Sequence, residues 1–236
     1  MGVPTVSPMP LSIITGASRG LGLALARSLA ERGWVLVLDA RGPEDLESTA
    51  AELGRVTEVV AIAGDVSDPD HRRELIAAAG ERIDMLVNNA SVLGPSPQPA
   101  LANYHLDELE RVYRVNVLAP LALVQLALPR FADGARILNV TSDAAIEPYE
   151  GWGGYGSSKA ALEQVTAILA VEHPELRVYA VDPGDMRTRM HQEAFPGEDI
   201  TDRPEPEESV PGLLALIEGE HPSGRYRARE LAGVRA

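Results

Sequence analysis

The hydrophobic pattern of this chain alternates between two periods. Short, nearly continuous apolar runs have the length of strands that are buried on both faces of a sheet. Between them lie longer segments whose Ala, Leu and charged residues are typical of amphipathic helices. The predicted strands are Leu11–Thr15, Trp34–Leu38, Val56–Ala63, Ile83–Asn88, Arg136–Thr141, Arg177–Val181 and a weaker one over Arg225–Ala228.

Capping signals set the helix boundaries. Gly33 is placed as a C-cap, and Pro43 suits the first position of the next helix. Asp68-Pro69 supplies an N-cap and N1 for a helix that ends at Gly80. Pro120 and Pro129 are expected to kink or shorten the longest helix. The predicted helices are Leu21–Arg32, Glu44–Leu53, the helix after Asp68, Asp107–Phe131, Gly154–Glu172 and Val210–Glu218.

The regular alternation of strand and helix indicates the fold class. It predicts an α/β domain with a doubly wound, Rossmann-like parallel sheet of about seven strands and helices on both faces. We expect residues 1–10 to form a flexible N-terminal tail and residues 11–236 to form one domain. The segment Pro196–Glu208 is rich in Pro and acidic residues, which predicts an exposed loop rather than a second domain.

Composition narrows the classes of function. The chain has 236 residues, 45% of them hydrophobic, which suffices for a sizeable core. Acidic residues outnumber basic ones 35 to 21, and the resulting charge of −14 disfavours nucleic acid as a partner. The chain has no cysteine, so thiolate metal sites and Cys nucleophiles are excluded. Its five His residues share no ligand spacing, and no metal is predicted.

Two features of the sequence, its first ten residues and its longest apolar stretch, bear on where the protein resides. The first ten residues have neither a basic side chain nor a long apolar stretch, so they do not form a secretory signal. The apolar stretch near Leu118–Leu128 is too short to span a bilayer. The sequence therefore predicts a cytoplasmic protein without a membrane partner.

A glycine-rich segment, Thr15–Gly22, joins the first strand to the first helix. Glycines there allow a tight turn, and the helix N-terminus offers free N–H groups to a pyrophosphate. Its spacing differs from the G-x-G-x-x-G fingerprint, and such a turn can also serve only to reverse the chain. Its position after the first strand of a βα series favours phosphate binding.

Tyr155 and Lys159 are four residues apart and share one face of a helix. Lys159 is the single lysine among 21 basic residues; a coding bias toward Arg explains the excess of Arg but not the position of this Lys. A free Tyr has a pKa near ~10, and a neighbouring positive charge favours the phenolate. We therefore expect Lys159 to lower the pKa of Tyr155 and to tune it for proton transfer.

These elements together resemble the short-chain dehydrogenase/reductase family from about Leu11 to Thr188. The resemblance lies in a T-G-x-x-x-G-x-G turn (Thr15–Gly22), Asp65-Val66 after the third strand, Asn88-Asn89-Ala90 with Ser91 in place of the Gly of N-N-A-G, Asn116 in the long helix, Ser142 thirteen positions before Tyr155, Y-x-x-x-K (Tyr155, Lys159) and P-G-x-x-x-T (Pro183, Gly184, Thr188).

The resemblance implies roles for these residues. Ser142 would hold the reacting oxygen, Tyr155 would exchange a proton, Lys159 would also bind the nicotinamide ribose, and Asn116 would support a water chain to Lys159. These four form the predicted catalytic set. The predicted cofactor-binding residues are Gly16, Ser18, Arg19, Gly20, Leu21, Gly22, Arg41, Asp65, Val66, Asn89, Ala90, Tyr155, Lys159, Pro183, Gly184 and Thr188.

The end of the second strand bears on which nicotinamide cofactor is used. An acidic residue there binds the adenosine ribose and selects NAD, and Asp39 is a candidate. The resemblance places the selecting position at Ala40 instead, with Arg41 next to it and Arg19 as a second basic position typical of NADP-preferring members. NADP(H) is favoured, with NAD as the alternative.

The sequence thus predicts an NADP(H)-dependent oxidoreductase that moves a hydride between nicotinamide and a small carbonyl or secondary alcohol. One alternative is a catalytically quiet nucleotide sensor or interaction protein on the same scaffold. Another is an epimerase or dehydratase, which the short segment after Thr188 disfavours.

The resemblance also implies a substrate lid over about residues 186–208 and a homo-oligomer, either dimer or tetramer. Trp152 is interpreted equally well as a pocket wall or as a surface packing residue. Four apolar residues of the long helix suit either a subunit interface or the core: Val117, Leu118, Leu121 and Leu128.

Overall fold

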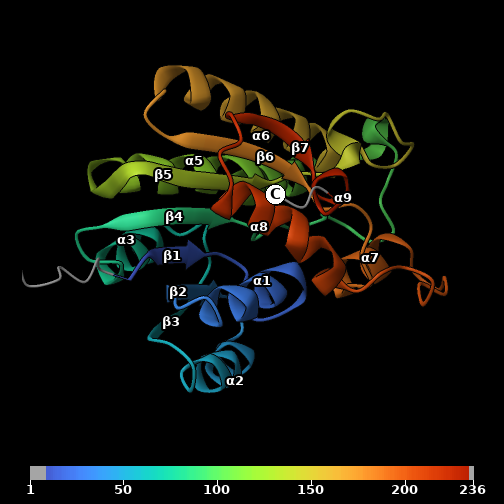
Figure 1. The fold of residues 1–236 in the computed structure, drawn as a ribbon. Helices are drawn as coiled ribbons and strands as arrows, with labels where there is room; N and C mark the ends of the chain where they lie inside the picture. Colours follow the sequence, from blue (N-terminus) through green and yellow to red (C-terminus); the bar gives the residue numbers. More distant parts are fainter. Residues whose placement is uncertain (1–8, 234–236) are drawn as a thin grey trace, which may run out of the picture.

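Seven parallel strands form one sheet in the order β3-β2-β1-β4-β5-β6-β7 (Figure 1). The computed structural model describes residues 9–233, so most of the predicted tail lies outside the described residues. The strands are Leu11–Ile14 (β1), Val35–Ala40 (β2), Val59–Ala63 (β3), Ile83–Asn88 (β4), Phe131–Val140 (β5), Arg177–Asp182 (β6) and Gly224–Arg227 (β7).

The strand order reverses at β1. The chain first moves outward to β2 and β3, then returns to the other side of β1 and continues from β4 to β7. The connections that leave the carboxyl ends of β1 and β4 therefore run in opposite directions along the sheet. This is a switch point, which is where doubly wound sheets bind ligands. The predicted fold class is confirmed.

The helices cover both faces of this sheet. They are Gly20–Ala30 (α1), Pro43–Leu53 (α2), Pro69–Ala78 (α3), Leu106–Tyr113 (α4), Ala119–Ala127 (α5), Gly153–Glu172 (α6), Arg189–Ala194 (α7), Val210–Glu218 (α8) and Ala228–Leu231 (α9). The Asp68 cap is confirmed, since its carboxylate accepts a hydrogen bond from the backbone N–H of Asp70. The short helices α7 and α9 were not predicted.

The predicted continuous helix Asp107–Phe131 is wrong in two respects. A π-helical turn over Arg114–Leu118 separates α4 from α5, and a 3₁₀ turn over Leu128–Arg130 follows. Pro120 and Pro129 stand in the first turns of α5 and of this 3₁₀ segment, where a missing N–H is tolerated. Phe131 opens β5 instead of closing the helix, because it pairs with Ile83 of β4.

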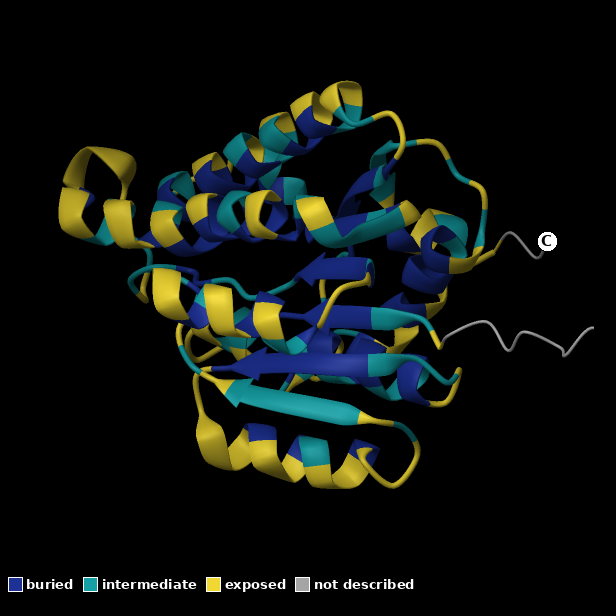
Figure 2. Ribbon diagram, turned by 90° about the vertical axis from the view of Figure 1, so that its left-hand side faces the viewer, coloured by how far each residue is buried: buried dark blue, intermediate teal, exposed yellow. Residues whose placement is uncertain are grey.

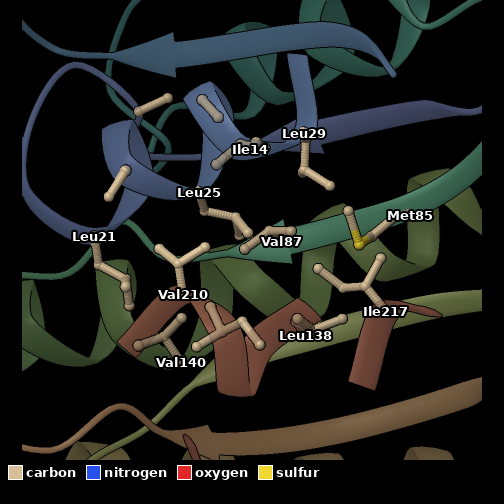
Figure 3. Close-up of a cluster of buried hydrophobic side chains, with 14 of the residues drawn as sticks. Ile14, Leu21, Leu25, Leu29, Met85, Val87, Leu138, Val140, Val210 and Ile217 are labelled. Atoms are coloured by element: carbon tan, nitrogen blue, oxygen red, sulfur yellow. The ribbon is translucent and has the colours of Figure 1, made fainter. Parts of the chain in front are cut away.

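Two apolar layers hold the sheet between its helices. On one face, α1 and α8 pack against strand residues such as Ile14, Val87 and Leu138 (Figure 3), and α2 packs on the same face against β2 and β3. On the other face, α3, α5 and α6 pack against Ile13, Leu86 and their neighbours. Adjacent residues of one strand thus serve opposite layers, as the two-residue period of a strand requires. Figure 2 shows the consequence: the central strands are buried, and the outward faces of the helices are exposed.

The combined run Leu106–Arg130 is long and apolar enough to resemble a membrane-spanning helix by length and composition. Half of its most apolar window is buried inside the protein. A core helix that packs on a sheet passes the same test, so this run is only weak evidence for a membrane span.

Candidate active site

One cavity of about 760 Å³ follows the carboxyl ends of the strands. Residues after β1, β2, β3, β4, β5 and β6 all contribute to its wall. It brings together the predicted catalytic residues Ser142, Tyr155 and Lys159. Of the predicted cofactor-binding residues it is lined by all except Gly22, namely Gly16, Ser18, Arg19, Gly20, Leu21, Arg41, Asp65, Val66, Asn89, Ala90, Tyr155, Lys159, Pro183, Gly184 and Thr188.

The glycine turn is held against the end of β4 by hydrogen bonds. The side-chain amide of Asn89 donates to the backbone oxygens of Thr15 and Gly16, at 2.9 and 3.0 Å. The Thr15 hydroxyl in turn accepts from the backbone N–H groups of Asn89 and Ala90, both at 3.0 Å. These bonds give the turn a fixed shape at the mouth of the cavity.

Two glycines of the turn are required for different reasons. Gly16 has φ +66°, a conformation that L side chains rarely adopt. Gly22 lies behind the turn, where an added Cβ would stand 2.4 Å from the Gly16 oxygen. Gly22 therefore lets α1 approach the turn closely, which explains why it belongs to the motif without lining the cavity.

Asp39 lines the cavity at the end of β2, which is the position on which the alternative prediction of NAD depends. Its side chain is almost fully buried, with one carboxylate oxygen 2.6 Å from Nε2 of His71 and the other accepting from the Gly16 N–H at 3.3 Å. Burial raises the pKa of Asp39 despite these bonds, and the hydrogen bond to Asp39 raises the pKa of His71. Both oxygens are thus engaged by the protein itself.

The two basic residues predicted for the cofactor remain available at the cavity. Arg19 precedes α1 and Arg41 follows β2, and both are exposed. Burial raises the pKa of Asp65, but hydrogen bonds from Ser67 and the nearby charge of Arg41 outweigh it and leave that pKa below its usual value. Arg41 and Asp65 therefore lie at the same end of the cavity.

Tyr155 and Lys159 lie on the buried side of α6, as their spacing predicts. The Lys159 ammonium donates to the Val140 oxygen at 2.7 Å and stands 5.5 Å from the centre of the Tyr155 ring. Ser142, directly after β5, donates from its hydroxyl to Asp143 at 2.9 Å. The three side chains thus come from α6 and the end of β5 to one wall of the cavity.

The expected lowering of the Tyr155 pKa by Lys159 is wrong for this structure. Burial raises the pKa of Tyr155 above its usual value, and the charges of Asp143 and Asp182 add to this, while the hydroxyls of Ser91 and Ser142 oppose it. Burial also lowers the pKa of Lys159, to about 7, with Glu163 opposing, so the positive charge that was expected to act on Tyr155 is itself disfavoured.

Asn116 lies in the π-helical turn and is buried, but it does not line the cavity. Its side-chain oxygen accepts from the Ser91 hydroxyl and the Val92 N–H, and its nitrogen donates to the Val92 oxygen and the Ser158 hydroxyl, all at 2.9 to 3.0 Å. Asn116 thus fastens the loop after β4 to α6. Among the described residues, no direct hydrogen bond joins it to Lys159, so its support of a water chain stays a prediction.

One wall of the cavity is aromatic. Trp152 lines the cavity and packs edge-on against Tyr155, with ring centres 5.9 Å apart, and against Phe195 at 5.8 Å. Trp152 is therefore a pocket wall, which resolves the two interpretations. Met190 and His191 of α7 also line the cavity, within the segment expected to form the lid.

Two features of the site were missed from the sequence. Arg225 of β7 donates to Glu163 of α6 at 2.9 Å and to Asp182 of β6 at 3.4 Å. Nothing in a weak strand signals such a pairing. Ser91 lines the cavity and donates a hydrogen bond to Asn116. Ser91 replaces the Gly of the N-N-A-G motif, and this replacement was a signal from which a hydrogen bond at this position could have been predicted.

The fold and the site define a class. The sheet is doubly wound and has a glycine turn at its switch point, which is typical of a nucleotide-binding protein. A Ser, a Tyr and a Lys on the same cavity are residue types suited to proton transfer. The family model described as short chain dehydrogenase matches residues 11–199. The chain belongs to the short-chain dehydrogenase family of oxidoreductases.

Known proteins similar to this chain include two curated reductases. Sepiapterin reductase of Rattus norvegicus is 34% identical over 197 residues, which are 76% of this chain and 75% of that protein. The rhamnolipids biosynthesis 3-oxoacyl-[acyl-carrier-protein] reductase of Pseudomonas aeruginosa is 36% identical over 192 residues, 76% of this chain and 74% of that protein. A solved short chain dehydrogenase of Escherichia coli CFT073, complexed with NADPH, has a TM-score of 0.84 at 27% identity and covers 93% of this chain and 96% of that one.

Proposed function

We propose that this protein is an NADP(H)-dependent carbonyl reductase that reduces a small ketone or aldehyde and catalyses the reverse alcohol oxidation. The observation that carries the proposal is the shared cavity: Tyr155, Lys159 and Ser142 line the same space as the glycine turn. A site for proton transfer therefore lies next to a site suited to a dinucleotide.

The residues of the cavity fit a nicotinamide cofactor. An added Cβ at Gly16 would stand 3.0 Å from the Ala90 backbone, so the turn can lie this close to the end of β4 only with glycine at that position. The N-terminus of α1 favours that pyrophosphate, Asp65 and Val66 would contact the adenine, and Lys159 the nicotinamide ribose. The bound nicotinamide supplies the hydride.

The choice of NADP(H) rests on charge at the adenosine end. Arg41 and Arg19 are exposed at the cavity, whereas the Asp39 carboxylate is buried against His71. A 2′-phosphate adds negative charge that two guanidinium groups favour, and Arg binds phosphate through paired hydrogen bonds. The NADPH complex of the similar Escherichia coli protein supports the same choice.

The protein's own groups suit the reduction of a carbonyl. The Ser142 hydroxyl is placed to donate to the carbonyl oxygen once it turns from Asp143. Tyr155 keeps its proton at neutral pH because burial raises its pKa, and it can deliver that proton to the oxygen as negative charge develops there. The names of both similar curated proteins, which are reductases, support this direction.

The test is oxidation of NADPH, followed at 340 nm, against sepiapterin, a 3-oxoacyl thioester and an aromatic diketone. We expect turnover with at least one carbonyl, preference for NADPH over NADH, and a loss of about 10²- to 10⁴-fold in Tyr155→Phe with unchanged NADPH affinity. Cofactor binding without turnover of any of them would favour a nucleotide sensor instead. Wild-type turnover by Tyr155→Phe would exclude the proposed proton donor.

A further inference from the structure

The carboxyl end of β2 carries an acidic residue, although the cofactor proposed above has an additional phosphate. Asp39 lines the cavity together with Ala40 and Arg41, which follow it in the chain. A carboxylate at this strand end binds the ribose hydroxyls of NAD, and its negative charge repels the 2′-phosphate of NADP. An uncompensated charge on Asp39 would therefore work against the attraction that Arg41 exerts on that phosphate.

His71 of α3 pairs with this carboxylate inside the protein. Its Nε2 atom lies 2.6 Å from one carboxylate oxygen of Asp39, and both side chains are buried. The other oxygen accepts from the Gly16 N–H at the longer distance of 3.3 Å. The short contact to His71 is typical of a hydrogen bond between charged partners. His71 is thus the principal partner of Asp39.

The backbone after β3 fixes the position of the His71 ring. An added Cβ at Gly64 would stand 2.6 Å from both Cγ and Cε1 of His71, so the ring packs directly on this glycine. The Gly64 N–H donates to the Ala40 oxygen at 3.0 Å, which ties this seat to the end of β2. Gly64 and Asp39 line the cavity, whereas His71 lies outside its lining. His71 can therefore influence a ligand in the cavity only through its neighbours.

The number of protons on the pair sets its charge. One proton lies between Nε2 and the carboxylate, and a second on Nδ1 makes the net charge of the pair zero instead of −1. The hydrogen bond to Asp39 raises the pKa of His71 against the effect of burial, and the charges of Glu74 and Asp68 raise it further. Burial raises the pKa of Asp39 as well. Both directions favour the neutral pair.

We infer that His71 is a specificity-determining residue for the cofactor: it neutralises the Asp39 carboxylate, so that the acidic end of β2 accepts a 2′-phosphate beside Arg41. His71 acts through Asp39 and not by contact with the cofactor. No covalent bond forms or breaks in this role. The inference rests on the proposed function, because it concerns the NADP(H) that is assigned there.

The test measures the dissociation constants of NADPH and NADH by fluorescence titration at pH 7 with no carbonyl present. His71→Gln, Asp39→Asn and the double variant are compared with the wild type. Gln at position 71 keeps an N–H donor for Asp39 but cannot take up a proton, so the carboxylate keeps its full charge. His173→Gln is the matched control, because His173 also pairs with a carboxylate, that of Glu175 at 3.0 Å, but does not line the cavity.

We expect His71→Gln to weaken NADPH binding on the order of tenfold and to leave NADH binding within about twofold of the wild type, because only NADPH carries the repelled phosphate. Competition by 2′,5′-ADP should weaken as NADPH binding does, and competition by 5′-AMP should not change. Adding Asp39→Asn to His71→Gln should restore NADPH binding. Asp39→Asn alone and His173→Gln should match the wild type. Should His71→Gln fail to fold, His71→Asn takes its place.

Unchanged NADPH binding in His71→Gln overturns the inference, and so does a double variant in which that binding is not restored. An equal loss of NADPH and NADH overturns it too, since it would indicate a role in packing only. The titrations need no turnover. A protein that binds NADPH but reduces none of the carbonyls therefore contradicts the proposed reaction, while the titrations still decide the role of His71.

Discussion

At the scale of single residues, burial changes the chemistry that residue type alone indicates. Tyr155 and Lys159 share a helix face, but both are nearly inaccessible to solvent, with 8% and 2% of their surface exposed. Burial penalises the charged form of each side chain, which raises the pKa of the phenol and lowers that of the ammonium. The folded protein therefore favours the neutral form of both side chains, whereas the sequence predicts a charged Lys159 that lowers the pKa of Tyr155.

The lowered pKa of Lys159 has a consequence for stability. Its pKa is about 7 in the folded protein and 10.5 in a free side chain, so the unfolded chain binds more protons between these values. The free energy of unfolding should therefore rise with pH across that window. Lys159→Met removes this contribution, and its stability relative to the wild type should decline steadily from pH 7 to 10. Urea unfolding of both proteins at several pH values checks this. A difference that is constant with pH contradicts it.

The burial of Asp39 makes a separate prediction about the cofactor. Its oxygens bond to His71 and Gly16, whereas Arg41 is exposed at the cavity. Arg41→Ala should weaken NADPH binding on the order of tenfold through the loss of charge-assisted bonds, with little effect on NADH. Asp39→Asn should leave the ratio of the two affinities unchanged. Fluorescence titrations of each variant with both cofactors measure this, and a selective loss of NADH binding in Asp39→Asn would restore Asp39 as a ribose ligand.

At the scale of elements, one arginine joins four parts of the site. Arg225 on β7 donates to Glu163 on α6, to Asp182 at the end of β6 and to the Ser142 backbone oxygen after β5. Glu163 also accepts from the Thr141 hydroxyl at 2.7 Å, and it lies one helical turn beyond Lys159. The last strand of the sheet thereby contacts Ser142 and the two elements that carry Glu163 and Asp182.

Loss of this arginine should destabilise the protein. In Arg225→Met, two mostly buried carboxylates lose Arg225 as an ion-pair partner, while Glu163 keeps the Thr141 hydroxyl and Asp182 keeps the Gly184 N–H. The cost should be about 1–3 kcal/mol after allowance for partial exposure. Arg225→Lys should recover only part of it, since an ammonium cannot reproduce the planar guanidinium fork. Adding Glu163→Gln to Arg225→Met should recover part of the stability by removing one carboxylate. Chemical denaturation measures each step, and full stability of Arg225→Met would show that the cluster contributes nothing.

At the scale of the whole molecule, the sheet and its helices leave a few apolar side chains outside. Of the four candidates for a subunit interface, Val117 is buried, and Leu121 and Leu128 pack partly buried against the core. Leu118 is the only one of the four that is exposed, with 55% of its surface accessible to solvent. Ile168 and Val171, which are exposed on α6 of the same helical layer, add to the apolar surface.

We therefore keep the prediction of a homo-oligomer and assign it to this layer. The wild type should run as a dimer or tetramer in size-exclusion chromatography with light scattering, and Leu118→Glu should shift it toward monomer by placing a charge in the interface. Val56→Glu, at an exposed apolar position before β3, is the matched control and should not change the assembly. A monomeric wild type, or identical behaviour of both variants, rules out this interface.

Several features were determined by the sequence because they depend on neighbours along the chain. Apolar runs, capping residues such as Asp68 and the glycine turn specify their own local structure, and their order predicts the doubly wound sheet. The spacing of Tyr155 and Lys159 likewise places both on one helix face. The βα order brings the carboxyl ends of the strands together, so the motifs that follow those strands lie at one cavity.

Tertiary structure decided the state and direction of those side chains. Asp39 is engaged by His71, which is 32 residues away in the chain, and Trp152 becomes a pocket wall against Phe195. The helix over Asp107–Phe131 is interrupted by a π turn that positions Asn116 against Ser91. Desolvation and hydrogen bonding act between atoms that folding brings together, so periodicity and spacing along one chain carry no record of them.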